Sequence, residues 1–297
     1  MIMDILSDVF ARASRNSWLT PVGKSMLRLP GAGSVLRRFQ NEILPRGGRV
    51  WLQISTGPAR GLWLKVEPYL EERYLSGCPE PGVQGEIVNH LRAGACLYDV
   101  GAHIGFYSLL AARLVGGDGR VVAFEPDPAN ASVLQANVSR NGLSQVEVIQ
   151  AALWSHCGVV TFQRSAAEHP ELSSRRGTVV PSHATDLGSS LIEVEAVTLD
   201  AFSESRCLPT MIKIDVEGGE IDVVNGAERL IALSRPVLLI EVHHQQAAVF
   251  LEKHLRQREY RLDWLAGHPH FAFPRHLLAR PEKQAPTDHS DDAGWLR

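Results

Sequence analysis

The amino-acid sequence predicts an α/β fold built on a mostly parallel β-sheet. Short apolar runs alternate with segments of helical periodicity between residues 81 and 265, which is the pattern of consecutive strand–helix–strand units. Four of these runs end at an acidic residue, namely Asp99, Glu125, Asp215 and Glu241. Parallel strands connected by helices bring their carboxyl ends to one edge of the sheet, where ligands bind. The four acidic side chains are therefore expected on one rim.

The composition is that of a globular protein. Of the 297 residues, 44% are hydrophobic and 21% are charged, which suits one large domain with an extension. A net charge of −3 gives no reason to expect a nucleic-acid partner. The apolar runs are shorter than the ~18 residues that a membrane span needs. The N-terminus also lacks the residue order of a signal peptide, so we expect a cytoplasmic protein.

The cysteines favour the same compartment. Cys78, Cys96, Cys157 and Cys207 lie far apart, without the paired spacing of a metal site. Cys96 and Cys207 flank apolar segments and are expected to be buried thiols. We predict neither a disulfide framework nor a zinc site, which fits a reducing cytoplasm.

Residues 1–80 are predicted to form an extension that packs on the main domain. Helical periodicity indicates a helix over 3–14 and a short one over 35–43, and residues 49–66 alternate as a hairpin around Gly57-Pro58. Basic residues outnumber acidic ones in the first 49 positions. A solvated face explains this bias, and peripheral contact with an acidic membrane or a polyanionic substrate is the alternative. The sequence does not define the oligomeric state.

The main domain is predicted over residues 81–279. In its first half we expect a helix that ends near Gly94 and a strand that stops at Asp99. Asp127-Pro128 should start another helix, since aspartate is a good N-cap and proline suits the first helical position. The other expected elements are a helix over 106–115 and strands over 121–124, 146–153 and 158–162.

The second half begins with a polar, serine-rich stretch over residues 164–190. A loop of this length inside a compact domain indicates a lid-like segment. Beyond it we expect strands over 192–199, 210–214 and 237–240, a helix containing Val223 to Ile231, and a helix around Leu251. Residues 260–265 and 270–273 are expected to form a closing strand pair, followed by a flexible tail over 280–297.

The turn after the first strand indicates a nucleotide site. Gly101 and Gly105 are separated by three residues in the pattern D-x-G-x-x-x-G, which differs from the G-x-G-x-x-G of dinucleotide enzymes and lacks a P-loop lysine. Asp99 before the first glycine suits a ligand that carries an amine or a sulfonium. Glu125 follows at the distance of a carboxylate that accepts both ribose hydroxyls. S-adenosylmethionine has all of these groups.

Several stretches resemble the FkbM family of S-adenosylmethionine-dependent methyltransferases. They are DVGAHIGFYS, AFEPDP, IKIDVEGGEIDVVNGAERLI and PVLLIEVH, within residues 74–244. The resemblance implies a class I methyltransferase fold, which is a Rossmann-like three-layer sandwich with a seven-stranded sheet whose last strand is antiparallel. It also implies methyl transfer, mostly to hydroxyl groups of sugars or natural products. His103 stands where many relatives carry asparagine.

The resemblance also assigns roles to site residues. It places Asp99, Gly101, Ala102 and Gly105 at the methionine end of the cofactor, with His103 in the same loop, Glu125 and Pro126 at the ribose, and the segment around Ala152 at the adenine. Asp215 faces the reactive methyl group. An alcohol acceptor must lose its proton, and the candidate bases are Asp215, Glu217, Glu220 and His243. Glu220 also suits the first turn of a helix for purely structural reasons.

The resulting hypothesis is an S-adenosylmethionine-dependent O-methyltransferase acting on a sugar, a glycan or another small-molecule scaffold. Asp215, Glu217, Glu241 and His243 offer ligands that would also suit Mg²⁺, so metal assistance stays open. Two alternatives are an NAD(P)-dependent oxidoreductase and a nucleoside-binding module without catalysis. The glycine spacing disfavours the first, and the retained Asp215 and Glu217 disfavour the second.

Overall fold

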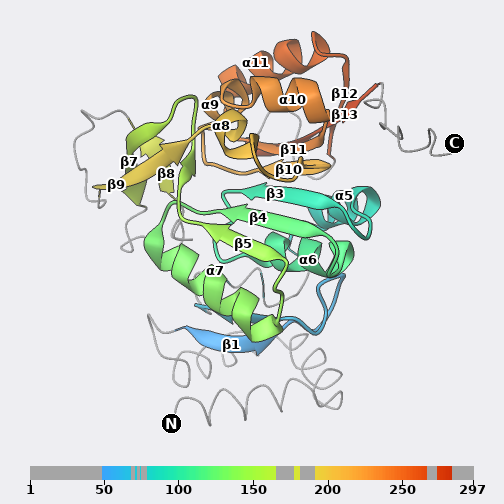
Figure 1. Cartoon of the computed structure of the whole chain (residues 1–297), viewed down its shortest axis with the longest axis vertical. Coiled ribbons are helices and arrows are strands. Elements are labelled where there is room, and N and C mark those ends of the chain that lie inside the picture. The colour runs from blue at the N-terminus through green and yellow to red at the C-terminus, as the bar shows by residue number, and fades with distance from the viewer. Residues whose placement is uncertain are drawn as a thin grey trace, which may run out of the picture.

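A computed structural model describes residues 49–67, 71, 74, 79–164, 177–180, 191–265 and 273–282 of the chain. Its centre is a seven-stranded sheet in the order β12-β13-β11-β10-β3-β4-β5 (Figure 1). The strands are β3 (Cys96–Val100), β4 (Arg120–Phe124), β5 (Val146–Ile149), β10 (Met211–Ile214), β11 (Val237–Val242), β12 (Tyr260–Trp264) and β13 (Arg275–Pro281). The helices expected over 3–14 and 35–43 lie outside the described residues.

The sheet has the predicted mixture of parallel and antiparallel strands. β3 lies between β4 and β10 and is parallel to both, and β11 continues the parallel set beside β10. β13, the last strand of the described residues, inserts between β11 and β12 and is antiparallel to each of them. The predicted α/β fold with an antiparallel last strand is confirmed.

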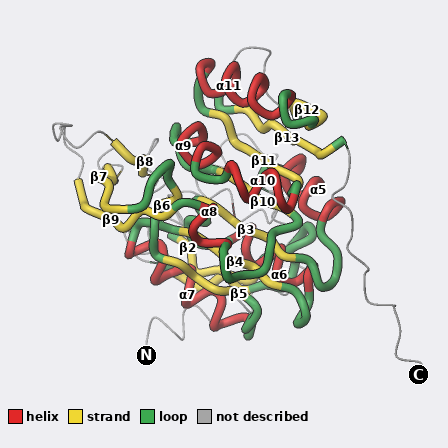
Figure 2. The backbone as a smooth tube through the Cα atoms, turned by 45° about the horizontal axis from the view of Figure 1, so that its top comes forward, coloured by secondary structure: helices red, strands yellow, loops and turns green. Residues whose placement is uncertain are grey.

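Successive residues of a strand point to opposite faces of the sheet, so a strand made of apolar residues places apolar side chains on both faces. Helices cover both faces. Leu97 packs in one hydrophobic core and Tyr98 in the other. The first core is closed by α5 (Pro81–His90), α6 (Phe106–Val115) and α7 (Pro128–Asn141), and the second by α8 (Leu199–Ser203), α9 (Glu220–Asn225), α10 (Glu228–Ser234) and α11 (Gln245–Arg256). Figure 2 shows the resulting three layers. No helix in the described residues is long and apolar enough to cross a bilayer.

The predicted hairpin is present as β1 (Val50–Gln53) and β2 (Trp63–Val66), which pair antiparallel. Two side chains of α7 fasten it to the main domain. Asn137 Oδ1 accepts a hydrogen bond from the Lys65 amide at 2.7 Å, and Asn141 both accepts from and donates to the backbone of Trp63. These hydrogen bonds join the hairpin to α7.

A second, four-stranded sheet was not expected. It has the order β6-β9-β7-β8, with β6 (Ala152–Leu153), β7 (Gly158–Arg164), β8 (Gly177–Val180) and β9 (Leu191–Val197). The prediction of one strand over 146–153 was wrong, because a turn with a hydrogen bond from the Ala151 amide to the Ile149 carbonyl splits it between two sheets. Strand β8 lies inside the stretch expected to be a loop. It pairs with β7, and the rest of that stretch lies outside the described residues.

Smaller corrections concern element ends. The helix expected over Val223 to Ile231 is two helices, because Gly226 separates them where a Cβ would lie 2.1 Å from the Trp154 carbonyl oxygen. The strand expected to stop at Asp99 continues to Val100. The preceding helix ends at His90 and is capped by Leu91 rather than Gly94.

The closing strand lies later in the sequence than predicted. Residues 270–272 of the strand expected over 270–273 lie outside the described residues. The strand that pairs with β12 is β13, which begins at Arg275 and continues through positions 280 and 281 that were assigned to the tail. Pro274 and Pro281 flank the apolar run from Leu277 to Ala279 and made it look like a loop. Only the residues of this strand that face the cores need to be apolar, and Leu277 and Leu278 point to opposite cores.

The capping of α7 gives a first testable prediction. Asp127 Oδ1 accepts from the Ala129 amide at 2.7 Å and from the Asn130 amide at 3.3 Å, and Asp127 Oδ2 accepts from Arg164 Nε. Asp127→Ala is expected to lower the free energy of unfolding by about 1–2 kcal/mol. Urea denaturation measures this. Asp118→Ala, at an exposed turn, is the control, and an equal loss in both variants would contradict the capping role.

Candidate active site

The glycine loop after β3 joins three strand ends. The Gly101 and Ala102 amides both donate to the Phe124 carbonyl at the end of β4, at 3.0 and 2.9 Å. Gly101 has φ +77°, and a Cβ there would lie 1.8 Å from the Asp215 carbonyl oxygen that follows β10. The first glycine is therefore required by backbone packing between neighbouring strands.

The second glycine is required by helix packing. Gly105 has φ +89°, and a Cβ there would meet Leu134 Cδ1 of α7 at 2.0 Å. A side chain at this position would therefore collide with α7. His103 between the glycines has φ +54°, in the left-handed region where asparagine and histidine are both enriched. This explains why histidine can replace asparagine in the loop.

Glu125, directly after β4, has a fixed carboxylate. Its Oε2 accepts from the His103 amide at 2.7 Å, and its Oε1 accepts from the Asp127 amide at 3.0 Å and from Asn130 Nδ2 at 3.4 Å. Burial raises the pKa of Glu125, the two backbone donors oppose this effect, and the result is a pKa of about 7. A carboxylate held in this way keeps its orientation and has further lone pairs for hydroxyl donors.

A pocket opens beside Glu125. Its walls come from the ends of the main strands and from the second sheet, and they are Val100, Gly101, His103, Phe124, Glu125, Pro126, Asn130, Ala151, Ala152, Leu153, Trp154, Phe162, Gly177, Val179, Asp215, Val216 and Glu217. The lining combines apolar side chains with carboxylates, which suits a ligand with a flat base, a ribose and a charged tail. This set of side chains fits S-adenosylmethionine.

Most of the predicted cofactor residues line this pocket. Gly101, His103, Glu125, Pro126 and Ala152 belong to its wall, as do the predicted catalytic residues Asp215 and Glu217. By contrast, Asp99, Ala102 and Gly105 are buried behind the wall, within the fold that supports the loop. A direct contact of these three with the cofactor stays a prediction.

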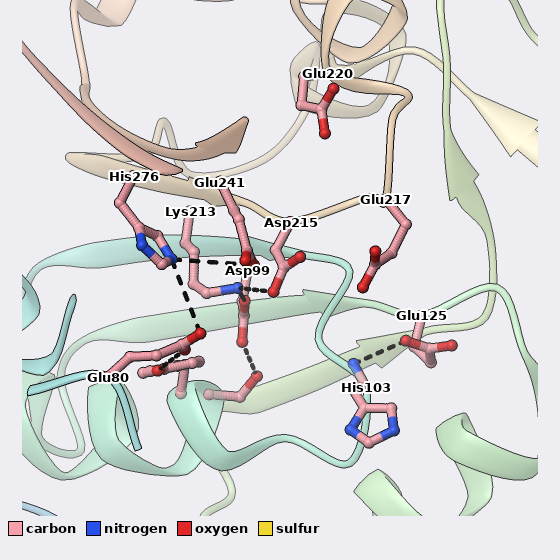
Figure 3. Close-up of polar contacts among 12 residues, drawn as sticks. Glu80, Asp99, His103, Glu125, Lys213, Asp215, Glu217, Glu220, Glu241 and His276 are labelled. Carbon is pink, nitrogen blue, oxygen red and sulfur yellow. Dashed lines mark hydrogen bonds and ion pairs between the residues drawn. The ribbon is translucent and has the colours of Figure 1, made fainter. Parts of the chain in front are cut away.

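Behind the pocket lies a buried charge cluster, shown in Figure 3. Lys213 on β10 places its Nζ 3.4 Å from Asp215 Oδ2 and 3.8 Å from Asp99 Oδ1, and Ser108 donates to Asp99 at 2.5 Å. Burial lowers the pKa of Lys213, but the surrounding carboxylates outweigh it and raise the pKa above its usual value. Lys213 is therefore a permanent cation at the base of the site.

His243 lies between two carboxylates at the rim. Its Nε2 is 3.1 Å from Glu217 Oε2, and its Nδ1 is 2.5 Å from Glu220 Oε1. Burial by itself would lower the pKa of His243, but the two carboxylates raise it by a larger amount. The result is a pKa of about 10. The ring is thus an imidazolium near neutral pH, which holds Glu217 in place. Glu217 itself has φ +53°, a backbone conformation that costs energy for this residue type.

Glu241 is a neutral acid at the same rim. Burial, the charge of Asp215 and a hydrogen bond with it raise the pKa of Glu241 to about 9. Two groups of side chains in the described residues have ligand atoms within 4.8 Å of one another, and they are Glu80, Glu241, His276 and Asp215, Glu241, His243. Of the four acidic strand ends expected on one rim, Asp215 and Glu241 are therefore together, and Glu241 belongs to both groups.

Several pocket residues were not predicted. Phe162 and Val179 come from strands β7 and β8, whose pairing is visible only in three dimensions. Gly177 belongs to the same strand pair, and a Cβ there would meet the Phe162 ring at 2.3 Å. Asn130 gave a weak signal, since it follows the predicted N-cap by three residues and faces Glu125.

Comparison with known proteins agrees with this site. The Methyltransferase FkbM domain matches residues 99–262, more than half of the chain. The 31-O-demethyl-FK506 methyltransferase FkbM of Streptomyces tacrolimicus is 29% identical over 209 residues, 62% of this chain and 74% of that protein. The hexuronic acid methyltransferase AglP of Haloferax volcanii is 28% identical over 210 residues, 66% of this chain and 80% of that protein.

Two other similarities cover less of the protein compared. The ribosomal protein L11 methyltransferase of Pelotomaculum thermopropionicum is 43% identical over 65 residues, 22% of this chain and 20% of that protein. The crystal structure of methyltransferase FkbM from Methylobacillus flagellatus has a TM-score of 0.47 at 20% identity and covers 71% of this chain. This chain spans about a fifth of the first protein and 52% of the second.

The sheet order and the matched domain support the same assignment. A parallel sheet with an inserted antiparallel last strand is the arrangement expected of a class I methyltransferase. The matched residues begin at Asp99 and include the glycine loop, Glu125, Asp215 and His243. The chain therefore belongs to the FkbM family of S-adenosylmethionine-dependent methyltransferases.

Proposed function

We propose that the protein transfers a methyl group to a hydroxyl oxygen of a sugar or natural-product scaffold, with Asp215 as the base. The observation that carries this proposal is that Asp215 lines the same pocket as Glu125 and Glu217. When bound, S-adenosylmethionine supplies an activated methyl group on a sulfonium. The remaining requirement is a group that aligns the hydroxyl and takes its proton.

The neighbours of Asp215 suit this role. The Lys213 ammonium at 3.4 Å stabilises its negative charge, and the neutral acid of Glu241 donates a hydrogen bond to it. An acceptor hydroxyl at the pocket mouth would donate to Asp215 and leave its proton on the carboxylate. Glu217 would hold a second hydroxyl, and His243 is a positioning residue that orients Glu217.

The acceptor class is inferred from the rim and the relatives. Hydrogen-bond acceptors dominate the described part of the rim, which suits an acceptor with several hydroxyl groups. The relatives in Streptomyces tacrolimicus and Haloferax volcanii are described as acting on 31-O-demethyl-FK506 and on hexuronic acid. Both names give a small-molecule or saccharide acceptor.

Two measurements test the proposal in order. Isothermal titration with S-adenosylhomocysteine tests the pocket, and no binding at high micromolar ligand would contradict it. Transfer of a radiolabelled methyl group to a panel of methyl glycosides, hexuronic acids and hydroxylated macrolides then tests the reaction. A base-stable labelled product indicates an ether, whereas a base-labile product indicates a carboxyl ester. Binding without any transfer would favour a nucleoside-binding module.

A divalent cation is the second version of the same reaction. Asp215, Glu241 and His243 would supply two oxygen ligands and one nitrogen ligand, and the metal would polarise the acceptor hydroxyl. The fixed charge of Lys213 beside Asp215 opposes a dication at this position. We expect turnover to survive treatment with EDTA. Loss of turnover that Mg²⁺ restores would instead support the metal-assisted version.

Glu125 gives a prediction for cofactor binding. Glu125→Ala removes the acceptor for both ribose hydroxyls, and each such bond to a charged group contributes about 1.5–3 kcal/mol. The dissociation constant for S-adenosylhomocysteine is expected to rise about 100-fold or more by calorimetry. Glu193→Ala, at an exposed position of β9, is the control. Similar affinities in both variants would exclude Glu125 from the site.

The same residue predicts a pH dependence. Hydroxyl donors bind the carboxylate form of Glu125, and its pKa of about 7 means that this form is lost as the pH falls. Affinity for S-adenosylhomocysteine is therefore expected to be constant at alkaline pH and to decrease below about pH 7. Glu125→Gln should remove the dependence. An unchanged profile in that variant would assign the titration to another group.

A further inference from the structure

Two thiols lie against each other at the edge of the sheet that is opposite the active site. Cys96 is the first residue of β3, and Cys207 precedes β10 in the segment after α8. Their Sγ atoms are 2.8 Å apart, closer than two unbonded sulfur atoms normally approach. Cys96 is buried and Cys207 is exposed, so the expectation of two buried thiols was correct for Cys96 alone.

The backbone around the pair is held in register by hydrogen bonds. The amide and the hydroxyl of Thr210 both donate to the Cys96 carbonyl, at 2.8 and 2.9 Å. The Tyr98 hydroxyl donates to the Cys207 carbonyl at 2.7 Å. Tyr98 lies two residues after Cys96, and Thr210 lies three residues after Cys207. Each of these hydrogen bonds therefore holds one cysteine against the segment that carries the other. The sulfur atoms would need to move by less than about 1 Å to reach the disulfide bond length of about 2.05 Å.

The surroundings do not suit a metal. Structural zinc sites in proteins use four ligands. Within the residues that the structure describes, the groups of three or more metal-ligating side chains contain no cysteine. Cys207 is exposed and also lines a pocket with Arg120, Glu147 and Arg206, which a small molecule can enter. A pair of close thiols with one accessible member is the arrangement of an oxidisable dithiol.

We propose that Cys96 and Cys207 are an oxidation site that forms an intrachain disulfide when the protein meets a hydroperoxide. The Cys207 thiolate attacks the peroxide oxygen, the O–O bond breaks, and Cys207 becomes a sulfenic acid while the peroxide is reduced to water or an alcohol. Cys96 sulfur then attacks the sulfenic sulfur and releases a second water. The two cysteines lose two electrons and two protons in total. This proposal is independent of the methyl acceptor.

The geometry also sets the order of the two steps. Exposure makes Cys207 the thiol that meets the oxidant first. Burial and the neighbouring Cys207 sulfur raise the pKa of Cys96, which keeps it a thiol until its partner has been oxidised. Cys96 therefore acts as the resolving residue. The reverse order would require the oxidant to reach a buried sulfur.

The disulfide would close a loop between positions 111 residues apart and join β3 to the segment that leads into β10. Closing a long loop reduces the freedom of the unfolded chain. The oxidised protein is therefore expected to melt about 5 °C or more above the reduced protein. Incubation with dithiothreitol should reverse the shift.

The test uses the full chain, reduced and then treated with hydrogen peroxide at low molar excess. Remaining thiols are alkylated, and peptides are mapped by mass spectrometry without reduction. We expect one linked pair that contains Cys96 and Cys207, with a mass lower by two hydrogen atoms. Cys157→Ser, at an exposed position, is the matched control and should still form the link and show the melting shift.

Cys207→Ser should abolish both the linked peptide and the melting shift. This variant changes an exposed side chain, so it tests the proposal even where replacement of the buried Cys96 prevents folding. Full alkylation of Cys96 and Cys207 after peroxide treatment would overturn the proposal. A link from either cysteine to Cys78 or Cys157 would overturn it equally.

Discussion

Asp215→Asn is expected to lower the turnover number about 100-fold or more while binding of S-adenosylhomocysteine stays within a few-fold of the wild type. Asparagine keeps the size of the side chain but cannot take a proton, and a positioned base typically contributes a factor of about 10²–10⁴. The carbonyl oxygen of this residue packs against Gly101, and that backbone contact is unaffected by the substitution. The glycine loop should therefore keep its shape.

The measurement is methyl transfer to whichever acceptor the panel identifies, with calorimetry run in parallel. Asp118→Asn is the control, because it makes the same chemical change at an exposed turn. Glu217→Gln provides a sharper comparison, since both carboxylates line the pocket. If Glu217→Gln lost turnover and Asp215→Asn kept it, the base would be Glu217. An equal loss of cofactor binding in Asp215→Asn and Glu125→Ala would show that the two roles are not separate.

Lys213→Met is expected to destabilise the folded protein by about 3 kcal/mol or more. Methionine fills the same space without charge, so Asp99 and Asp215 would lose the cation that lies within 4 Å of both. Removing one partner of a buried ion pair typically costs about 3–5 kcal/mol, because an uncompensated charge is left inside the protein. The cost is large here because Lys213 and Asp99 are both almost completely buried.

Urea denaturation measures the change, with Lys253→Met as the control at an exposed position of α11. The control should change the free energy of unfolding by less than about 0.5 kcal/mol. In the double variant Lys213→Met with Asp99→Asn, part of the loss should be recovered, because one buried carboxylate is removed with the cation. A Lys213→Met protein as stable as the wild type would mean that the cluster does not depend on its cation.

The parts of the fold that follow from local patterns were predicted from the sequence. The helix over 106–115 and the cap at Asp127 depend on periodicity and on one hydrogen-bonding side chain, and both are present as expected. Asp215 and Glu241 were also placed together, because parallel strands leave little freedom in where their carboxyl ends lie. These features need no knowledge of distant contacts.

The parts that were missed depend on pairing between distant segments. Strand β8 is recognisable only through its partner β7, and its four residues carry no alternation of their own. The state of His243 could not be predicted either, because Glu217 and Glu220 reach it from another strand end. The contact between Cys96 and Cys207 belongs to the same class, since 111 positions separate the two residues.

The insertion of β13 between β11 and β12 has a consequence for synthesis on the ribosome. Until residues 275–281 have left the exit tunnel, β11 has an open edge and β12 has no neighbour in this sheet. Open strand edges pair readily with other chains. The nascent protein therefore passes through a stage in which the edge of β11 is open to association with other chains, and the arrival of β13 closes it.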